Sequence, residues 1–311
     1  MTLLLTLLAC TSSGSDTTDT GAEVIDVRVD EADIQLPEGG WYWEGPDVVV
    51  DPGMDVMWCR SGTYEGDDVG VVTFATYQGE YGHHLQLYGT TLSPVDLPDG
   101  EDFDCTSSND LSMADLEPIG IQTETNNGSV GVELPPGFAY KLDAGQRYVL
   151  QSHYVNTSTQ PVHIRDLAVF AGVPEDQVET WANMLVVNHQ LFDLPPHEET
   201  SSSKSCSFDQ DYNVLALLGH LHEWGRSFQT ELTIGDQSSV VYDVPTWETT
   251  YRDAPPLNTY EEGAFTLHAG EVLTNHCTWF NDTDEAITFP HEMCTTVMLA
   301  YPMVASNVCS D

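Results

Sequence analysis

The sequence predicts an all-β protein made of two tandem antiparallel β-sandwiches. Segments rich in Val, Thr, Tyr and Phe recur between turn residues, and many alternate apolar with polar side chains, as in residues 228–234. Helical periodicity is scarce and is found only in residues 174–183. The 311 residues are about twice the length of a typical domain, so two domains are expected.

The expected divisions are a leader over residues 1–21, an N-terminal sandwich over 22–172 and a C-terminal sandwich over 173–311. Residues 1–10 read MTLLLTLLAC, which resembles a bacterial lipobox with Cys10 as the lipidated residue, and a polar Ser/Thr-rich tether follows. No Lys or Arg precedes the apolar run, so a buried N-terminal strand is the alternative. The lipobox predicts a protein of the cell envelope, or a secreted one, that meets the membrane only through its N-terminal lipid.

The charge balance excludes nucleic acid as a partner. The chain has 8 Lys and Arg against 50 Asp and Glu, a net charge of −42, which would repel a phosphate backbone. Such a surface is typical of a solvated, self-repelling protein, and we expect a monomer.

The cysteines also indicate export. With Cys10 lipidated, an even number remains, as expected for disulfides in an oxidising compartment. No two lie in a CxxC pair, so a zinc ribbon has no support. The six are Cys59, Cys105, Cys206, Cys277, Cys294 and Cys309.

The most specific local pattern is Gly219-His220-Leu221-His222-Glu223. Residues two apart in a strand point to the same face, so His220 and His222 can chelate one metal ion. The alternative is a pair of solvated histidines on an edge strand.

His83-His84 could bind one ion only where the strand bends, because neighbouring residues in a regular strand face opposite ways. Gly82 supplies a bend, although solvated histidines are the alternative at this position. His153 shares a strand face with Gln151 and would be the third imidazole, unless it is a core residue. Met293 could be simple packing, but a thioether beside two imidazoles is a soft ligand set that favours cuprous copper.

These elements, in this order, resemble the copper type II, ascorbate-dependent monooxygenases, the family of the peptidylglycine α-hydroxylating and dopamine β-monooxygenases. The resemblance covers roughly residues 40–311 and rests on the ordered set HH, LQxHY, HxH and EMC with a closing YP. It implies two jelly-roll-like sandwiches, each with one mononuclear copper. The implied ligands are His83, His84 and His153 for the first copper, and His220, His222 and Met293 for the second, catalytic copper.

The resemblance further implies that Gln151 lies near the first copper. It also implies three disulfides, Cys59–Cys105, Cys206–Cys309 and Cys277–Cys294. Neutral imidazoles are required for ligation, so activity should fall as the pH drops through the histidine range.

The function implied is hydroxylation of a substrate C–H bond with O₂ and a reductant such as ascorbate. The peptide-amidating branch binds a substrate carboxylate with Arg, Asn and Tyr, at positions that are Leu218, Thr295 and Val297 here. The small-molecule substrate is therefore expected to be less anionic than a peptidylglycine. The alternatives are a non-catalytic copper lipoprotein for storage or delivery, and a plain β-sandwich adhesion module that binds no copper.

Overall fold

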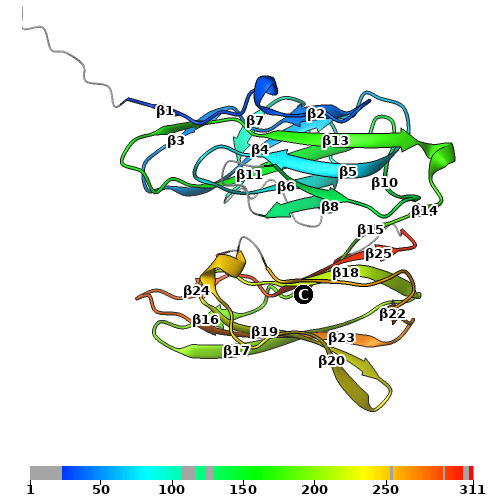
Figure 1. Ribbon diagram of the computed structural model, residues 1–311. Coiled ribbons are helices and arrows are strands. Elements are labelled where there is room, and N and C mark those ends of the chain that lie inside the picture. Colours follow the sequence, from blue (N-terminus) through cyan, green and yellow to red (C-terminus); the bar gives the residue numbers. More distant parts are fainter. Residues whose placement is uncertain are drawn as a thin grey trace, which may run out of the picture.

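The computed structural model describes residues 23–106, 116–123, 129–252, 255–289, 291–303 and 308–310. They form two β-sandwiches stacked one on the other (Figure 1), and the all-β prediction is confirmed. The predicted leader, with Cys10, lies outside these residues. No helix within these ranges has the length and apolar character of a membrane span.

The N-terminal sandwich consists of one sheet ordered β14-β10-β5-β13-β2, with β9 on β5, and a second ordered β7-β4-β11-β6-β8. A small third sheet is ordered β1-β12-β3. The strands are β1 (Ile25–Asp26), β2 (Trp41–Glu44), β3 (Val48–Val50), β4 (Asp55–Thr63), β5 (Val69–Tyr77), β6 (Gly82–Thr90), β7 (Asp102–Asp104), β8 (Leu116–Thr123), β9 (Ser129–Glu133), β10 (Phe138–Leu142), β11 (Arg147–Val155), β12 (Val162–Ile164), β13 (Leu167–Pro174) and β14 (Thr180–Trp181).

The C-terminal sandwich has an inner sheet ordered β21-β18-β25-β15-β26, with β22 on β18, and an outer sheet ordered β17-β23-β19-β20. A two-stranded sheet pairs β16 with β24. The strands are β15 (Asn183–Asn188), β16 (Asp193–Leu194), β17 (Glu199–Ser207), β18 (Tyr212–His220), β19 (Gly225–Ile234), β20 (Gln237–Val244), β21 (Leu257–Thr259), β22 (Thr266–Leu267), β23 (Val272–Phe280), β24 (Ile287–Thr288), β25 (Thr295–Tyr301) and β26 (Val308–Cys309).

Each sandwich has a core of its own between its two main sheets. Leu150 and Phe170 are almost fully buried in the first core, and Phe228, Trp279 and Leu217 in the second. Alternation along the strands produces this arrangement, because every second side chain points between the sheets and is removed from water. The outer strand β17 has the regular exposed-to-partly-buried alternation of a strand with one solvated face.

The chain passes from one sandwich to the other at Ala182. β14 pairs with β10 of the first sandwich, and β15 pairs with β25 of the second. The helix expected over residues 174–183 does not form, and a 3-10 turn at Glu175–Gln177 leads into β14 instead. The backbone pairing of β14 with β10 outweighs the weak helical pattern of this segment.

The two sandwiches share an apolar contact. Phe138 and Leu134 of the first half cluster with Leu215 of the second, and the rings of Phe138 and Tyr301 lie 5.1 Å apart. The inner sheet of the C-terminal sandwich therefore faces the N-terminal sandwich, as Figure 1 shows. This face also carries His220, at the end of β18.

Candidate metal centres

A β-bulge brings three histidines of the N-terminal sandwich together. His84 on β6 pairs with His153 on β11, and the pairing then skips His83, so that Gly82 lies opposite Tyr154. The bulge changes the direction of the His83 side chain and places two consecutive residues on one side of the strand. The bend expected at Gly82 is therefore present, and all three histidines are buried.

The spacing of these imidazoles suits one metal ion. One nitrogen from each ring lies within 4.8 Å of the others, and the Nδ1 atoms of His84 and His153 are 3.4 Å apart. Two nitrogens bound to one ion at about 2.0 Å would be about 3.3–3.5 Å apart in tetrahedral or trigonal geometry. The donor set therefore fits a three-imidazole site.

Asp55 determines which nitrogen His153 presents. The Nε2 atom of His153 is 2.5 Å from a carboxylate oxygen of Asp55, the first residue of β4. An ionised carboxylate only accepts hydrogen bonds, so Nε2 carries the proton and the Nδ1 lone pair faces His84. Partial burial acts to raise the pKa of Asp55, but the hydrogen bond and charge of His153 outweigh it, and the pKa is lowered.

The environment keeps the imidazoles of His83 and His84 neutral. Burial, reinforced by the neighbouring imidazole of His153, holds the pKa of His83 and His84 well below the usual value. A neutral imidazole has the lone pair that a metal requires. Protonation would therefore compete with a metal only at lower pH than for a free histidine.

The second group of histidines lies where β18 ends. The rings of His220 and His222 are 5.0 Å apart, close to the 4.6–4.9 Å spacings of the first group. The Nδ1 atom of His222 donates to the backbone carbonyl of His291 at 2.9 Å, which leaves Nε2 as the lone-pair nitrogen. Among the described residues this Nε2 is buried and has no hydrogen-bond partner, as expected of an atom that ligates an ion.

Burial also lowers the pKa of these imidazoles. It holds the pKa of His220 well below the usual value, and it lowers that of His222 to about 4 despite the opposing hydrogen bond to His291. Protonation of His222 is therefore expected only as the pH falls towards 4.

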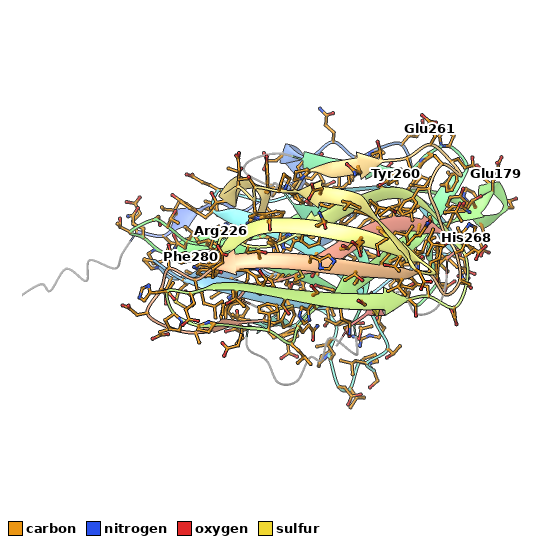
Figure 2. All side chains as sticks on the ribbon, turned by 90° about the horizontal axis from the view of Figure 1, so that it is seen from below. Glu179, Arg226, Tyr260, Glu261, His268 and Phe280 are labelled. Atoms are coloured by element: carbon orange, nitrogen blue, oxygen red, sulfur yellow. A yellow bond between two sulfur atoms is a disulfide. The ribbon has the colours of Figure 1, made fainter. Side chains whose placement is uncertain are left out.

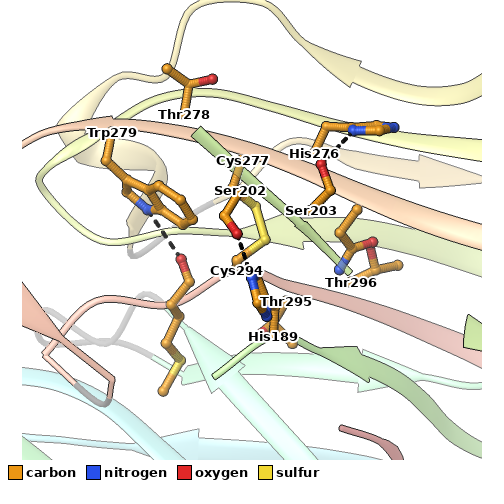
Figure 3. Close-up of a disulfide and its surroundings, with 12 residues drawn as sticks. His189, Ser202, Ser203, His276, Cys277, Thr278, Trp279, Cys294, Thr295 and Thr296 are labelled. Atoms are coloured by element: carbon orange, nitrogen blue, oxygen red, sulfur yellow. Dashed lines mark hydrogen bonds between the residues drawn. A yellow bond between two sulfur atoms is a disulfide. The ribbon is translucent and has the colours of Figure 1, made fainter. Parts of the chain in front are cut away.

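The backbone of Met293 is held next to His222. Met293 directly follows Glu292, whose carboxylate accepts a hydrogen bond from the backbone N–H of His222 at 2.5 Å. The Trp279 indole donates to the Met293 carbonyl at 3.3 Å (Figure 3), and the next residue, Cys294, is bonded to Cys277. The chain around Met293 is therefore fixed by a disulfide on one side and a carboxylate on the other.

The three disulfides implied by the resemblance are formed: Cys59–Cys105, Cys206–Cys309 and Cys277–Cys294. Gln151 lies against the first of them, with its amide nitrogen 3.7 Å from Cys105 Sγ and 3.9 Å from Cys59 Sγ. It shares a strand face with His153, but its amide is directed to the disulfide.

The two groups of histidines influence each other across the interface. The pKa of His83 is lowered mainly by burial and by His153, and then by Arg252, His222 and His220 of the C-terminal half. Arg252, paired with Glu223 of the C-terminal half at 3.1 Å, also acts on Asp55 of the N-terminal half. The groups are separate and face the same interface.

Two residues of these centres were missed by sequence reasoning. Asp55 has no local signal, because it reaches His153 only through the pairing of β4 with β11. Glu292 stands directly before Met293 in the EMC motif, so its position was visible but its role was not.

No family model matches the sequence, and no curated protein matches it. Among solved structures, the glycosylasparaginase PNGase F from Flavobacterium meningosepticum is similar with a TM-score of 0.33 and 10% identity, over 84% of this chain and 95% of that one. PBCV-1 VP54, fitted into a reconstruction of the virophage Sputnik, has a TM-score of 0.27 and 8% identity over 84% and 93%. The PBSX exported protein XepA has a TM-score of 0.22 and 9% identity over 86% and 88%. Likenesses this weak support no conclusion about function.

Proposed function

We propose that this chain is a copper-dependent monooxygenase of the cell envelope, with one copper in each sandwich. The observation that carries the proposal is the pair of histidine groups at one interface, the second of which adjoins Met293. His83, His84 and His153 would hold the first ion, and His220, His222 and Met293 the second. The lipid anchor at Cys10 is part of the same proposal.

Both donor sets suit copper, and the second set favours it over other common metals. Neither group contains a thiolate, which a structural zinc site would commonly use, and the oxygen ligands preferred by calcium and magnesium are absent from the proposed sets. Imidazole suits copper in both oxidation states, and the thioether of Met293 favours the cuprous form.

The residues of the chain would hold and orient the ions. Asp55 fixes the tautomer of His153, and the carbonyl of His291 fixes that of His222, so that each ring presents one defined nitrogen. Copper bound at both sites would supply the electrons for O₂ reduction coupled to hydroxylation of a C–H bond. The overall reaction takes O₂, two electrons from a reductant such as ascorbate and two protons, and yields a hydroxylated product and water.

The surface beside His220 favours an uncharged substrate group. His220 pairs with Thr295, and Leu218, two residues before His220, pairs with Val297. Leu218, His220 and Val297 are partly buried positions of the sheet that faces the N-terminal sandwich. Two aliphatic side chains there would contact an apolar C–H group but could form no ion pair with a carboxylate.

Metal analysis followed by oxygen uptake with ascorbate tests the proposal. We expect two coppers per chain and copper-dependent oxygen consumption. Met293→Ala should abolish hydroxylation while the first site stays loaded, and His153→Ala should impair electron supply while the second site stays loaded. Two bound coppers without oxygen consumption would instead favour storage or delivery, and a protein without stoichiometric copper would be a plain β-sandwich module.

A further inference from the structure

A single carboxylate oxygen connects the main chains of two proposed copper ligands. Oε1 of Glu292 accepts a hydrogen bond from the backbone N–H of His222 at 2.5 Å and another from the backbone N–H of Met293 at 2.8 Å. The second oxygen, Oε2, accepts from the backbone N–H of Trp224 at 3.2 Å. The carboxylate thus joins the turn after β18 to the segment before β25, which lie about 70 residues apart in sequence.

The position of Glu292 is unusual for an acidic residue in this chain. Its exposed fraction is 0%, although the chain carries 50 Asp and Glu and most acidic residues of proteins lie at the surface. All three of its hydrogen-bond partners given above are backbone N–H groups. A buried carboxyl with only main-chain partners serves the local shape of the chain, because removing it would leave buried donors unsatisfied.

Further hydrogen bonds hold His222 in place beside the segment that carries Met293. The His222 carbonyl accepts from the Trp247 indole at 3.0 Å, and His222 Nδ1 donates to the residue before Glu292. Ligands that are fixed before the metal arrives need less reorganisation on binding, and misplacing one by about 1 Å weakens a site.

We propose that Glu292 is the positioning residue of the second site, and that its Oε1 atom sets the separation between the main chains of His222 and Met293 for a shared soft metal. The inference rests on the proposed copper function only for the identity of the metal. The three hydrogen bonds to the Glu292 carboxylate, which we call the clamp, lie within the chain and can therefore be tested in the metal-free protein.

The first experiment measures cuprous copper affinity by competition with a chromophoric chelator. Glu292→Ala should weaken the second site about 10- to 100-fold and leave the first unchanged. Glu292→Gln keeps an oxygen for both ligand N–H groups and alters only the Trp224 contact, so it should bind both coppers within about threefold of the parent. Glu271→Ala is the matched control, since Glu271 also accepts a backbone N–H, from His268 at 2.7 Å, but at a solvated turn.

X-ray absorption of the cuprous protein gives a readout that a merely structural role would not change. Glu292→Ala should lose the sulfur contribution, while Glu292→Gln and Glu271→Ala should keep it. Equal affinity and an equal sulfur contribution in Glu292→Ala and the parent would overturn the proposal. If Glu292→Ala fails to fold, loss of the second copper from folded Glu292→Gln would also overturn it, and retention would support it.

Hydrogen exchange of the metal-free protein separates this proposal from the copper function. In Glu292→Ala, peptides covering residues 219–225 and 291–295 should exchange faster than in the parent, while those from the N-terminal sandwich should not change. Unchanged exchange in both peptides would refute the clamp. If Glu292→Ala exchanges faster than the parent in these two peptides but the parent binds no copper, the clamp is supported and the proposed function is refuted.

Discussion

The two sandwiches share a buried asparagine turn that their sequences do not reveal. Asn156 and Asn281 each follow the central strand of a sheet, and each donates its amide to two backbone carbonyls. Each also accepts from the hydroxyl of the residue two positions later, Ser158 or Thr283, at 2.7 Å. The same turn in both halves indicates that they share one architecture, and it gives the Asn-X-Ser/Thr patterns at Asn156 and Asn281 a structural role without a glycan.

The bulge that carries the first histidine group is also repeated. β6 bulges at His83 against β11, and β19 bulges at Arg226 against β23. A glycine precedes each bulge, and a Cβ atom at Gly82 or Gly225 would lie 2.7 Å from a neighbouring side-chain atom. The chain is therefore packed equally closely at both places.

Only one of the two bulges has the residues to bind a metal. In the C-terminal sandwich, the positions of the first histidine group are occupied by Arg226, Ser227 and Thr278. The histidines proposed as ligands in this half, His220 and His222, lie instead at the last residue of β18 and just after it, and β18 belongs to the sheet that faces the other sandwich. The shared fold therefore provides the bend, and the choice of side chains decides whether the bend is a metal site.

Replacing the two asparagines tests whether the two turns are equivalent, and these substitutions should have the largest effect on the free energy of unfolding. Asn156→Ala and Asn281→Ala should each lower the free energy of unfolding by about 2–4 kcal/mol, because each removes the side-chain donor of one buried carbonyl and one of two side-chain donors of a partly buried carbonyl. Urea unfolding of both variants measures this. A cost below about 1 kcal/mol in one half and a full cost in the other would mean that the turns are not equivalent.

A buried carboxyl of the N-terminal sandwich should make its stability depend on pH. Asp166 is fully buried and accepts from Tyr154 Oη at 2.5 Å and Gln78 Nε2 at 2.7 Å. Burial raises its pKa to about 6, against hydrogen bonds that lower it. A raised carboxyl pKa means that the folded state binds the proton more tightly than the unfolded state. The stabilisation that comes from this proton is complete below about pH 4 and is lost as the pH rises through 6.

The expected size of the Asp166 effect is about two pKa units, or roughly 3 kcal/mol at most. Asp166→Asn cannot titrate, so its unfolding free energy should fall less between pH 4 and pH 7 than that of the parent. The other carboxylates of the chain titrate in both proteins, and the difference between them isolates Asp166. Parallel pH profiles would show that Asp166 does not titrate in this range.

Asp55→Asn tests whether the two histidine groups are oriented independently of each other. The amide no longer enforces the proton on His153 Nε2, so the first site should lose about 10- to 100-fold in copper affinity. The second site should be unaffected, because His222 is oriented by a backbone carbonyl that no side-chain substitution removes. Copper titration monitored by the absorption of a competing chelator resolves the two sites. An equal loss at both sites would contradict the separate orientation of the two groups.

The fold class and the ligand candidates were accessible to sequence because they depend on local pattern. Alternation predicts strands, and the spacing of His220 and His222 places them on one side of the chain. The three cysteine pairs came from the family resemblance and are formed in the structure.

The residues that orient the ligands were not accessible in the same way. Asp55 meets His153 across 98 positions of sequence, and Glu292 meets His222 across 70. Such contacts depend on strand register and on the approach of distant turns, which composition does not encode. The repeated bulge was hidden for a similar reason, since only the pairing of strands reveals it.

Arg226→Gln should have the smallest effect on stability. It tests whether the second bulge shares only its backbone shape with the first or also a role in metal binding. Arg226 occupies the position of His83 but lies at the outer face of the C-terminal sandwich beside Phe280 (Figure 2), with its guanidinium carbon 5.5 Å from the ring centre. An exposed cation–π contact contributes about 0.5–1 kcal/mol, so urea unfolding should change by no more than this. Both copper affinities should stay as they are, whereas His83→Ala should remove the first copper. If Arg226→Gln weakened either copper site, the bulge of the outer sheet would be coupled to the interface, and the division of roles between the two halves would be wrong.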